Sequence, residues 1–313
     1  MIAIQDIAYV RYGAPDLDLM QAFLEDFGLH LTHRSESTLY MGGASDSPFV
    51  HVTERRDHAV PIGFGLRAKS LEDLQILASK LATTVEKNSA PGGGDVVRFV
   101  DPAGLSVEVV YGQTAVQSGL PALPVRKPIA VNRNGQRERN GTVRLAPAPS
   151  NITRLGHVAV QVSDIPRVVD FYTNTLGFKI SDSYWAGAKD NTIAVFLHCG
   201  LGEHWTDHHT IALIAAQDNR TRFDHSAFEV LDLDDLMQGN AFLARQGHQH
   251  SWGVGRHIQG SQIFDYWRDP FGNKIEHWTD GDMVNDASPL THVELNPGEL
   301  AQWGPALSPS FFD

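Results

Sequence analysis

Two patterns of hydrophobic residues follow one another along the chain, one typical of a strand and one typical of a helix. The same order returns in the second half. Residues 5–10 form a short, mostly apolar run, which predicts a strand. Apolar residues then recur every three or four positions through residues 17–28 and stop at a glycine, as in an amphipathic helix. Residues 155–160 and 168–177 show the same two patterns in the same order. The chain therefore contains a repeated strand–helix unit.

Further matches indicate that each half contains two such units. Gly28 and Gly177, which end the two expected helices, lie 149 residues apart. Residues 101–108 (DPAGLSVE) and 269–276 (DPFGNKIE) match at an offset of 168, and a similarly worded helix start (SLEDL, DLDDL) precedes each. Internal repetition is stronger evidence of architecture than local propensity. We predict an α+β fold of four βαβββ modules, paired two to a half.

Composition shifts mark the expected domain boundaries. Residues 113–150 are rich in Pro, Gly, Arg and Asn and show neither pattern, so we expect a linker between an N-terminal domain (1–112) and a C-terminal domain (151–285). Residues 286–313 are rich in proline and contain several aromatic residues. We expect this tail to pack against the body of the protein.

One hairpin carries an acidic residue in an apolar setting. Residues 256–268 and 274–278 are rich in aromatic side chains, and Asp269-Pro270-Phe271-Gly272 between them is a turn sequence. Glu276 lies in the second run, between Ile275 and His277. A carboxylate is costly to bury without a partner, so Glu276 requires a cation or a metal ion.

Two histidines on other expected strands complete a candidate metal site. His157 and His225 occupy strand positions in the second half, as Glu276 does. The repeat places Ala8 opposite His157, Ile62 or Gly63 opposite His225, and Glu108 opposite Glu276. Two imidazoles and one carboxylate are the facial triad of non-haem Fe(II) oxygenases. The alternative is that both histidines are hydrogen-bonded core residues without a metal.

Charge and cysteine content narrow the remaining classes of function. The net charge of −12 argues against a nucleic acid or an anionic membrane as partner. No apolar run approaches the roughly 20 residues of a membrane span, and no signal peptide is recognisable. The single cysteine excludes an internal disulfide and favours a reducing cytoplasm. We expect a cytoplasmic protein without a nucleic-acid or membrane partner.

The chain resembles a known family, the type I extradiol ring-cleaving dioxygenases of the vicinal oxygen chelate superfamily. The resemblance lies in the metal-free first half, the Leu-Gly-His-Val sequence around His157, and the Asp-Pro-x-Gly-x-x-Ile-Glu sequence that ends at Glu276. It implies that two vicinal-oxygen-chelate domains form and that the C-terminal one carries the metal. His157, His225 and Glu276 would bind Fe(II), or Mn(II) as in some members.

The same resemblance implies three catalytic residues. His209 matches the distal catalytic histidine of the family, although His208 is a rival for that role. His257 matches a histidine beside the metal, and Tyr266 matches the tyrosine near the ligand carboxylate. O₂ would be the co-substrate, a catechol the substrate, and a 2-hydroxymuconic semialdehyde-type compound the product. Homo-oligomers are common in the family, so a homo-oligomer is expected.

One departure from the family bears on the substrate. Relatives that cleave carboxylate-bearing catechols place arginines around the ring, and Trp252 stands where one of them is expected. This favours a catechol with an apolar or neutral substituent. The candidate wall residues are Trp252, Ile258, Trp185 and Phe196.

Three other functions share parts of this pattern. A 2-oxo acid dioxygenase uses the same triad, and a glyoxalase-like lyase uses a divalent metal without O₂. Neither accounts for His209, His257 and Tyr266 together. A non-enzymatic small-molecule binding protein of the same fold would need no triad.

Overall fold

The computed structural model describes residues 2–115, 126, 127, 129, 132, 135, 137, 139–218, 220–296, 300–307 and 311. The first half contains two helices and eight strands: β1 (Ile4–Ala14), α1 (Leu17–Phe27), β2 (His30–Arg34), β3 (Thr38–Gly42), β4 (His51–Arg55), β5 (Val60–Ala68), α2 (Leu71–Lys80), β6 (Glu86–Lys87), β7 (Asp95–Val100) and β8 (Ser106–Tyr111).

The second half repeats this order and adds short strands: β9 (Ile152–Val162), α3 (Ile165–Leu176), β10 (Lys179–Ala186), β11 (Ala188–His198), β12 (Thr206–Asp207), β13 (Ile211–Ala215), β14 (Arg222–Val230), α4 (Leu233–Gln246), β15 (Gln249–His257), β16 (Ile263–Arg268), β17 (Lys274–Thr279), β18 (Met283–Val284), β19 (Thr291–Glu294) and β20 (Ala301–Trp303).

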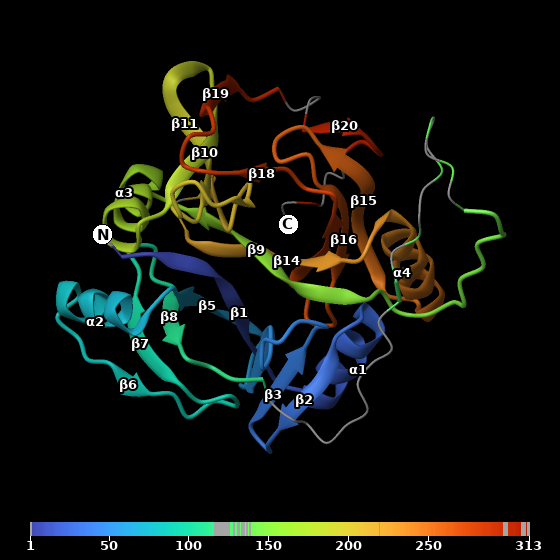
Figure 1. Ribbon diagram of the computed structural model, residues 1–313, viewed down its shortest axis with the longest axis horizontal. Coiled ribbons are helices and arrows are strands. Elements are labelled where there is room, and N and C mark those ends of the chain that lie inside the picture. The colour runs from blue at the N-terminus through green and yellow to red at the C-terminus, as the bar shows by residue number, and fades with distance from the viewer. Residues whose placement is uncertain are drawn as a thin grey trace.

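Each half builds one curved sheet with its helices outside (Figure 1). The first sheet has the order β2-β3-β4-β1-β5-β8-β7-β6, and the second has the order β19-β10-β11-β13-β9-β14-β17-β16-β15-β20. In both, the first strands of two modules pair in an antiparallel way at the centre, β1 with β5 and β9 with β14. The predicted α+β fold of four modules is confirmed.

The two halves share one hydrophobic core. Its buried residues come from both sheets and all four helices. Tyr12 on β1 donates a hydrogen bond from its hydroxyl to Ser226 Oγ on β14 at 3.2 Å. The ring of His277 on β17 stacks on Phe27 of α1 with centroids 3.8 Å apart. Contacts of this kind between buried rings fix how the first half packs on the second.

The predicted helix ends are correct, and the two first helices differ in length. Gly28 and Gly177 end α1 and α3 with φ of 115° and 78°, values that glycine adopts without strain. Helix α1 has 11 residues and α3 has 12. The offset of 149 between Gly28 and Gly177 is therefore one residue too large for the strands that precede these two helices.

The tail expected from the sequence contributes strands to the second sheet. β19 pairs in parallel with β10, and β20 pairs with β15. Phe311 is buried, while Trp303 is 45% exposed and Phe312 lies outside the described residues. The described residues between 113 and 150 carry no helix or strand. The expected division into four segments remains a prediction. No described helix is long and apolar enough to cross a membrane.

A buried histidine at the contact between the halves predicts how stability depends on pH. Burial lowers the pKa of His51 to about 3, whereas an unfolded histidine titrates near pH 6.5. Below about pH 6.5 His51 binds a proton in the unfolded chain but not in the folded protein, so the free energy of unfolding decreases as the pH falls. Between about pH 6.5 and pH 5 this group should lower the free energy of unfolding by about 2 kcal/mol.

Denaturant unfolding of wild type and His51→Leu at several pH values measures this contribution. The variant should lose the His51 part of the acid dependence. His58 is exposed, so His58→Leu serves as the control and should keep the wild-type profile. Equal acid dependence in all three proteins would contradict the assignment.

Candidate metal centre

The centre lies on one row of residues that crosses the middle of the second sheet. His157 on β9 pairs with Ala227 on β14, and Ala227 pairs with Glu276 on β17. Glu276 in turn pairs with Tyr266 on β16. Directly paired residues point to the same face of a sheet, so this row projects His157, Glu276 and Tyr266 together. His225 precedes Ala227 by two positions and joins the same face.

Three side chains on this face converge. Glu276 Oε2 lies 3.4 Å from His157 Nε2 and 3.3 Å from His225 Nε2. One ligand atom from each residue lies within 4.8 Å of the others, and all three side chains are buried. Burial lowers the pKa of His157 although Glu276 opposes the shift, so the neutral imidazole required of a metal ligand is favoured.

A bulge orients the second histidine. The pairing of β14 with β9 shifts by one residue between Phe223 and His225, which leaves Asp224 unpaired in the ladder. His225 Nδ1 donates to Asp224 Oδ1 at 2.8 Å, and Lys274 Nζ donates to the same oxygen at 2.8 Å. A proton on Nδ1 leaves His225 Nε2 with its lone pair free toward Glu276, the arrangement that outer partners impose on metal-binding histidines.

The carboxylate of Glu276 shows that a cation fits here. The side chain is fully buried, yet neither of its oxygens accepts a hydrogen bond from any described residue. A buried carboxylate without hydrogen bonds is costly unless a positive charge faces it. Two imidazole nitrogens and a carboxylate oxygen suit a divalent transition metal. The donor set therefore fits a bound Fe(II) or Mn(II).

The corresponding carboxylate of the first half is satisfied by the protein itself. Glu108 accepts hydrogen bonds from Tyr9 Oη at 2.6 Å, Arg11 at 3.0 Å and Arg98 at 2.9 Å. Strand pairing puts Tyr9, Gly65, Glu108 and Arg98 in one row, the counterpart of the row that ends at Tyr266. Guanidinium groups thus occupy the first half's site, as a structural copy without metal requires.

This pairing corrects two sequence correspondences. Tyr9, not Ala8, is the counterpart of His157, because the offset of 149 was counted across α3, which is one residue longer than α1. The counterpart of His225 is Gly63, since each lies two positions before the residue paired with the central glutamate. Ile62 is excluded.

His209 lies beside the triad, and His208 does not. The ring centroid of His209 is 4.2 Å from that of His157 and 5.0 Å from that of Phe196. His208 points instead to Asp182, with Nε2 2.8 Å from Oδ2. Burial, followed by the neighbouring histidines, holds the pKa of His209 well below its usual value. The geometry favours His209 over His208 as the group that faces substrate.

His257 and Tyr266 form one hydrogen-bonded pair next to Glu276. Burial lowers the pKa of His257 to about 4 and raises that of Tyr266 well above its usual value, so both are neutral near pH 7. His257 Nδ1 donates to Leu300 O at 3.2 Å, and the Tyr266 hydroxyl donates to His257 Nε2 at 3.0 Å. Trp252 stacks on Tyr266 with centroids 5.8 Å apart.

The other expected wall residues lie in different settings. Phe196 contacts His209, as described above. Trp185 is half-buried on β10, opposite Thr192 and Glu294 of the neighbouring strands. Ile258 is 40% exposed. The roles of all four wall residues remain predictions. Sequence reasoning missed Asp224, because an acid beside a histidine gives no sign of which way either side chain points. It missed Asp182 because this residue lies 26 positions from its partner His208.

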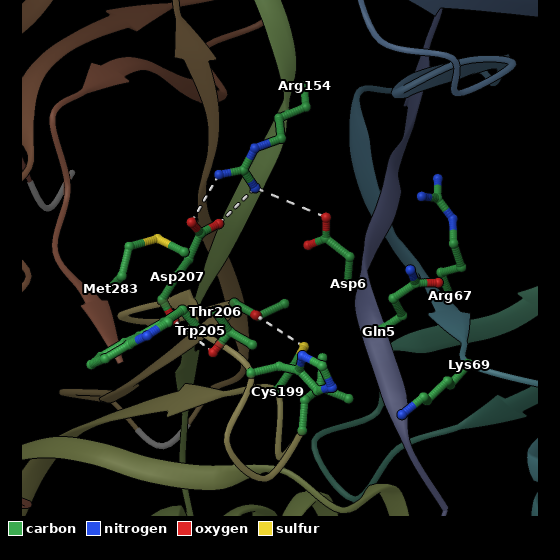
Figure 2. A pocket seen from close by; sticks show the side chains of 13 residues that line it. Gln5, Asp6, Arg67, Lys69, Arg154, Cys199, Trp205, Thr206, Asp207 and Met283 are labelled. Atoms are coloured by element: carbon green, nitrogen blue, oxygen red, sulfur yellow. Dashed lines mark hydrogen bonds and ion pairs between the residues drawn. The ribbon is translucent and has the colours of Figure 1, made fainter. Parts of the chain in front are cut away.

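A separate cavity of about 460 Å³ lies between the halves (Figure 2). Arg154 from β9 donates two hydrogen bonds to Asp207, at 2.6 and 2.8 Å, and lies 3.9 Å from Asp6 of β1. Figure 2 shows these three charged groups directed toward one another. The lining includes none of the triad residues. Charged groups of both halves, Asp6 from the first and Arg154 and Asp207 from the second, therefore meet at this cavity.

Comparison with known proteins identifies relatives of this chain. Residues 154–277, which contain the triad, match the family model described as the glyoxalase/bleomycin resistance protein/dioxygenase superfamily. Metapyrocatechase 2 of Cupriavidus necator is 30% identical over 99% of this chain and 92% of its own length. An iron-dependent extradiol dioxygenase of Rhodococcus jostii is 22% identical over 92% of this chain and 93% of its own.

Two solved structures have the same fold. The Mn(II)-bound glyoxalase of Novosphingobium aromaticivorans superimposes with a TM-score of 0.79 and 24% identity, covering 100% of this chain and 98% of that one. The complex of homoprotocatechuate 2,3-dioxygenase from Brevibacterium fuscum with 3,4-dihydroxyphenylacetate gives 0.78 and 21%, covering 99% and 92%. The full-length relative and the triad together show that the chain belongs to the type I extradiol dioxygenases of the glyoxalase/bleomycin resistance/dioxygenase superfamily.

Proposed function

We propose that this protein cleaves a substituted catechol with O₂ beside one of its hydroxyl-bearing carbons, using Fe(II) held by His157, His225 and Glu276. The observation that carries the proposal is the contrast between two carboxylates. Glu108 is saturated by protein donors, whereas both oxygens of Glu276 lack them. When bound, the iron would supply a centre at which catechol and O₂ meet, because a facial triad leaves three coordination positions open.

The surrounding residues would orient the substrate and handle its protons. A catechol hydroxyl within reach of the His257–Tyr266 pair could exchange a hydrogen bond with the Tyr266 hydroxyl, which His257 holds in place. His209 lies on the opposite flank, against His157. A neutral imidazole there can accept a proton from one oxygen of the substrate and return it to another. The expected product is a 2-hydroxymuconic semialdehyde-type compound.

The wall near Tyr266 favours a neutral substituent. Trp252 is buried, and its ring lies against Tyr266 and Phe311. Lys274, the cation beside the centre, is engaged by Asp224. A substrate carboxylate such as that of 3,4-dihydroxyphenylacetate, bound by the Brevibacterium fuscum enzyme, would meet an indole ring here. Methyl, alkyl or hydroxy substituents fit this chemistry better.

A second candidate is a metal-dependent lyase without O₂ chemistry. The Mn(II)-bound glyoxalase shares the whole fold, which favours this alternative. The His257–Tyr266 pair and His209 favour the dioxygenase, because a lyase gives no reason for all three beside one metal. We further propose that the protein works in the cytoplasm, because its single cysteine is buried and forms no disulfide. We also propose a homo-oligomer, because homo-oligomers are common in the family.

Glu276→Gln and Glu108→Gln should change metal-free stability in opposite directions. At about pH 8, Glu276→Gln removes a buried carboxylate without hydrogen-bond donors and should stabilise the metal-free protein by roughly 1–2 kcal/mol. Glu108→Gln removes one of the two carboxylate partners of Arg11 and of Arg98, which keep Glu54 and Glu86, and should cost roughly 1–3 kcal/mol. Denaturant unfolding of both variants measures these changes.

The same pair of variants tests the metal site. Titration with Fe(II) under anaerobic conditions should show one ion per wild-type chain and per Glu108→Gln chain. Glu276→Gln should lose more affinity than the roughly 10–100-fold that an outer-shell change costs. If Glu276→Gln bound iron as the wild type does, the triad assignment would be wrong.

Ring cleavage distinguishes the two candidate functions. The protein is loaded with Fe(II) without oxygen, mixed with 3-methylcatechol or 4-methylcatechol, and then exposed to air. We expect O₂ uptake and a yellow ring-fission product. Fully loaded protein that consumes no O₂ with a panel of catechols would exclude the dioxygenase and leave the lyase.

His209→Phe separates catalysis from metal binding. Because His209 contacts the triad without belonging to it, iron binding should persist while turnover falls by about 10²–10⁴-fold, the usual contribution of an acid–base group. His58→Phe, an exposed position, is the control. Loss of iron in His209→Phe would mean that His209 is itself a ligand.

A further inference from the structure

A chain of three buried side chains leads away from the metal centre behind His209. The Nδ1 atoms of His209 and His208 lie 3.0 Å apart. The other nitrogen of His208, Nε2, lies 2.8 Å from Asp182 Oδ2. All three residues are more than nine-tenths buried. Asp182, His208 and His209 therefore form one hydrogen-bonded relay.

The acidic end of the relay is fixed by the tail of the chain. Asp182 on β10 pairs with Thr291 of β19. Its second oxygen, Oδ1, accepts a hydrogen bond from the Thr291 backbone nitrogen at 3.0 Å and a short one from the Thr291 hydroxyl. Burial alone would raise the pKa of Asp182, but the bonds from His208 and Thr291 outweigh it and lower the pKa. Asp182 is therefore an ionised carboxylate that only accepts hydrogen bonds.

An ionised Asp182 sets the direction of every bond in the relay. Because the carboxylate can only accept, the proton of a neutral His208 must sit on Nε2. His208 Nδ1 is then bare and must accept, so His209 has to donate from its own Nδ1. His209 Nε2 is left without a proton. No described residue donates a hydrogen bond to it, so this lone pair is free for substrate.

We propose that Asp182 and His208 are positioning residues that hold His209 in the tautomer with a proton on Nδ1 and a bare Nε2. This inference rests on the proposed function, in which His209 faces the substrate. It deepens that function by ordering the proton transfers. A bare Nε2 cannot donate first, so His209 must take a proton from a substrate hydroxyl before it can return one to another oxygen.

Asp182→Asn reverses the relay without removing it. The amide oxygen can keep both bonds from Thr291, which turns the amide NH₂ toward His208. His208 Nε2 would then accept, its Nδ1 would donate, and His209 Nε2 would carry the proton. The analogous change in the Ser-His-Asp triad, a case known from serine proteases, leaves geometry intact and lowers kcat by about 10⁴ through the wrong tautomer.

The tautomers can be read directly in the metal-free protein. Nitrogen-15 NMR of histidine-labelled protein at about pH 8, above the ordinary pKa of imidazole, shows which ring nitrogen bears the proton. The His209 signals are assigned by their loss in His209→Phe. Wild type should show His209 protonated on Nδ1, and Asp182→Asn should show it protonated on Nε2. Asp18→Asn, which removes the same charge at an exposed helix position, should resemble wild type.

Two outcomes would overturn the relay: a proton on Nε2 of His209 in the wild type, or an unchanged tautomer in a folded Asp182→Asn protein. If Asp182→Asn fails to fold, two other measurements still test the relay: the tautomer of His209 in the wild type, and its tautomer in His208→Phe, where neither ring nitrogen should be preferred.

In the iron-loaded enzyme, Asp182→Asn should lower kcat by at least about 10²-fold with little change in KM. The NMR result does not depend on turnover, so a correct tautomer in a protein that cleaves no catechol would fault only the proposed function.

Discussion

A carboxylate buried in the middle of a sheet must face a positive charge, and both halves of this protein bury one at the same place. In the first half the charge comes from Arg11 and Arg98, which saturate Glu108. In the second half Tyr266 stands where Arg98 stands, His157 stands where Tyr9 stands, and no arginine donates to Glu276 among the described residues. No cationic side chain of the described residues is therefore hydrogen-bonded to Glu276, in contrast to Glu108. This one difference leaves room for a metal ion in the second sheet and not in the first.

The repeat made most of this predictable from the sequence. Glycine-ended helices and two DPxG turns are local signals with a clear physical basis, and their recurrence fixed four modules without knowledge of any contact. His157, His225 and Glu276 could be selected because metal-binding side chains on strands are conspicuous in apolar surroundings. The arginines that satisfy Glu108 were less visible, since arginines on strands are common at solvent-exposed edges.

The features that the sequence did not reveal depend on the register of the strands and on the direction in which side chains point. One extra residue in α3 turned the counterpart of His157 from Tyr9 into Ala8, and a one-residue slip moves a side chain to the other face of a strand. The bulge at Asp224 has no sequence signature, yet it puts Asp224 behind His225. Asp182, the partner of His208, also pairs with a strand near the C-terminus, which the proline-rich composition of the tail did not predict.

Three of the four histidines at the centre have a hydrogen-bond acceptor behind them. Asp224 fixes the proton of His225 on Nδ1, and Asp182 acts on His209 through His208 in the same sense. Leu300 O does so for His257 with a carbonyl in place of a carboxylate. Each of these acceptors holds a proton on the outer nitrogen of its histidine, so the inner nitrogen presents a lone pair, whereas Nδ1 of His157 has no hydrogen-bond partner among the described residues. A site assembled in this way attracts cations and acidic protons together, and a catechol bound to a metal supplies both.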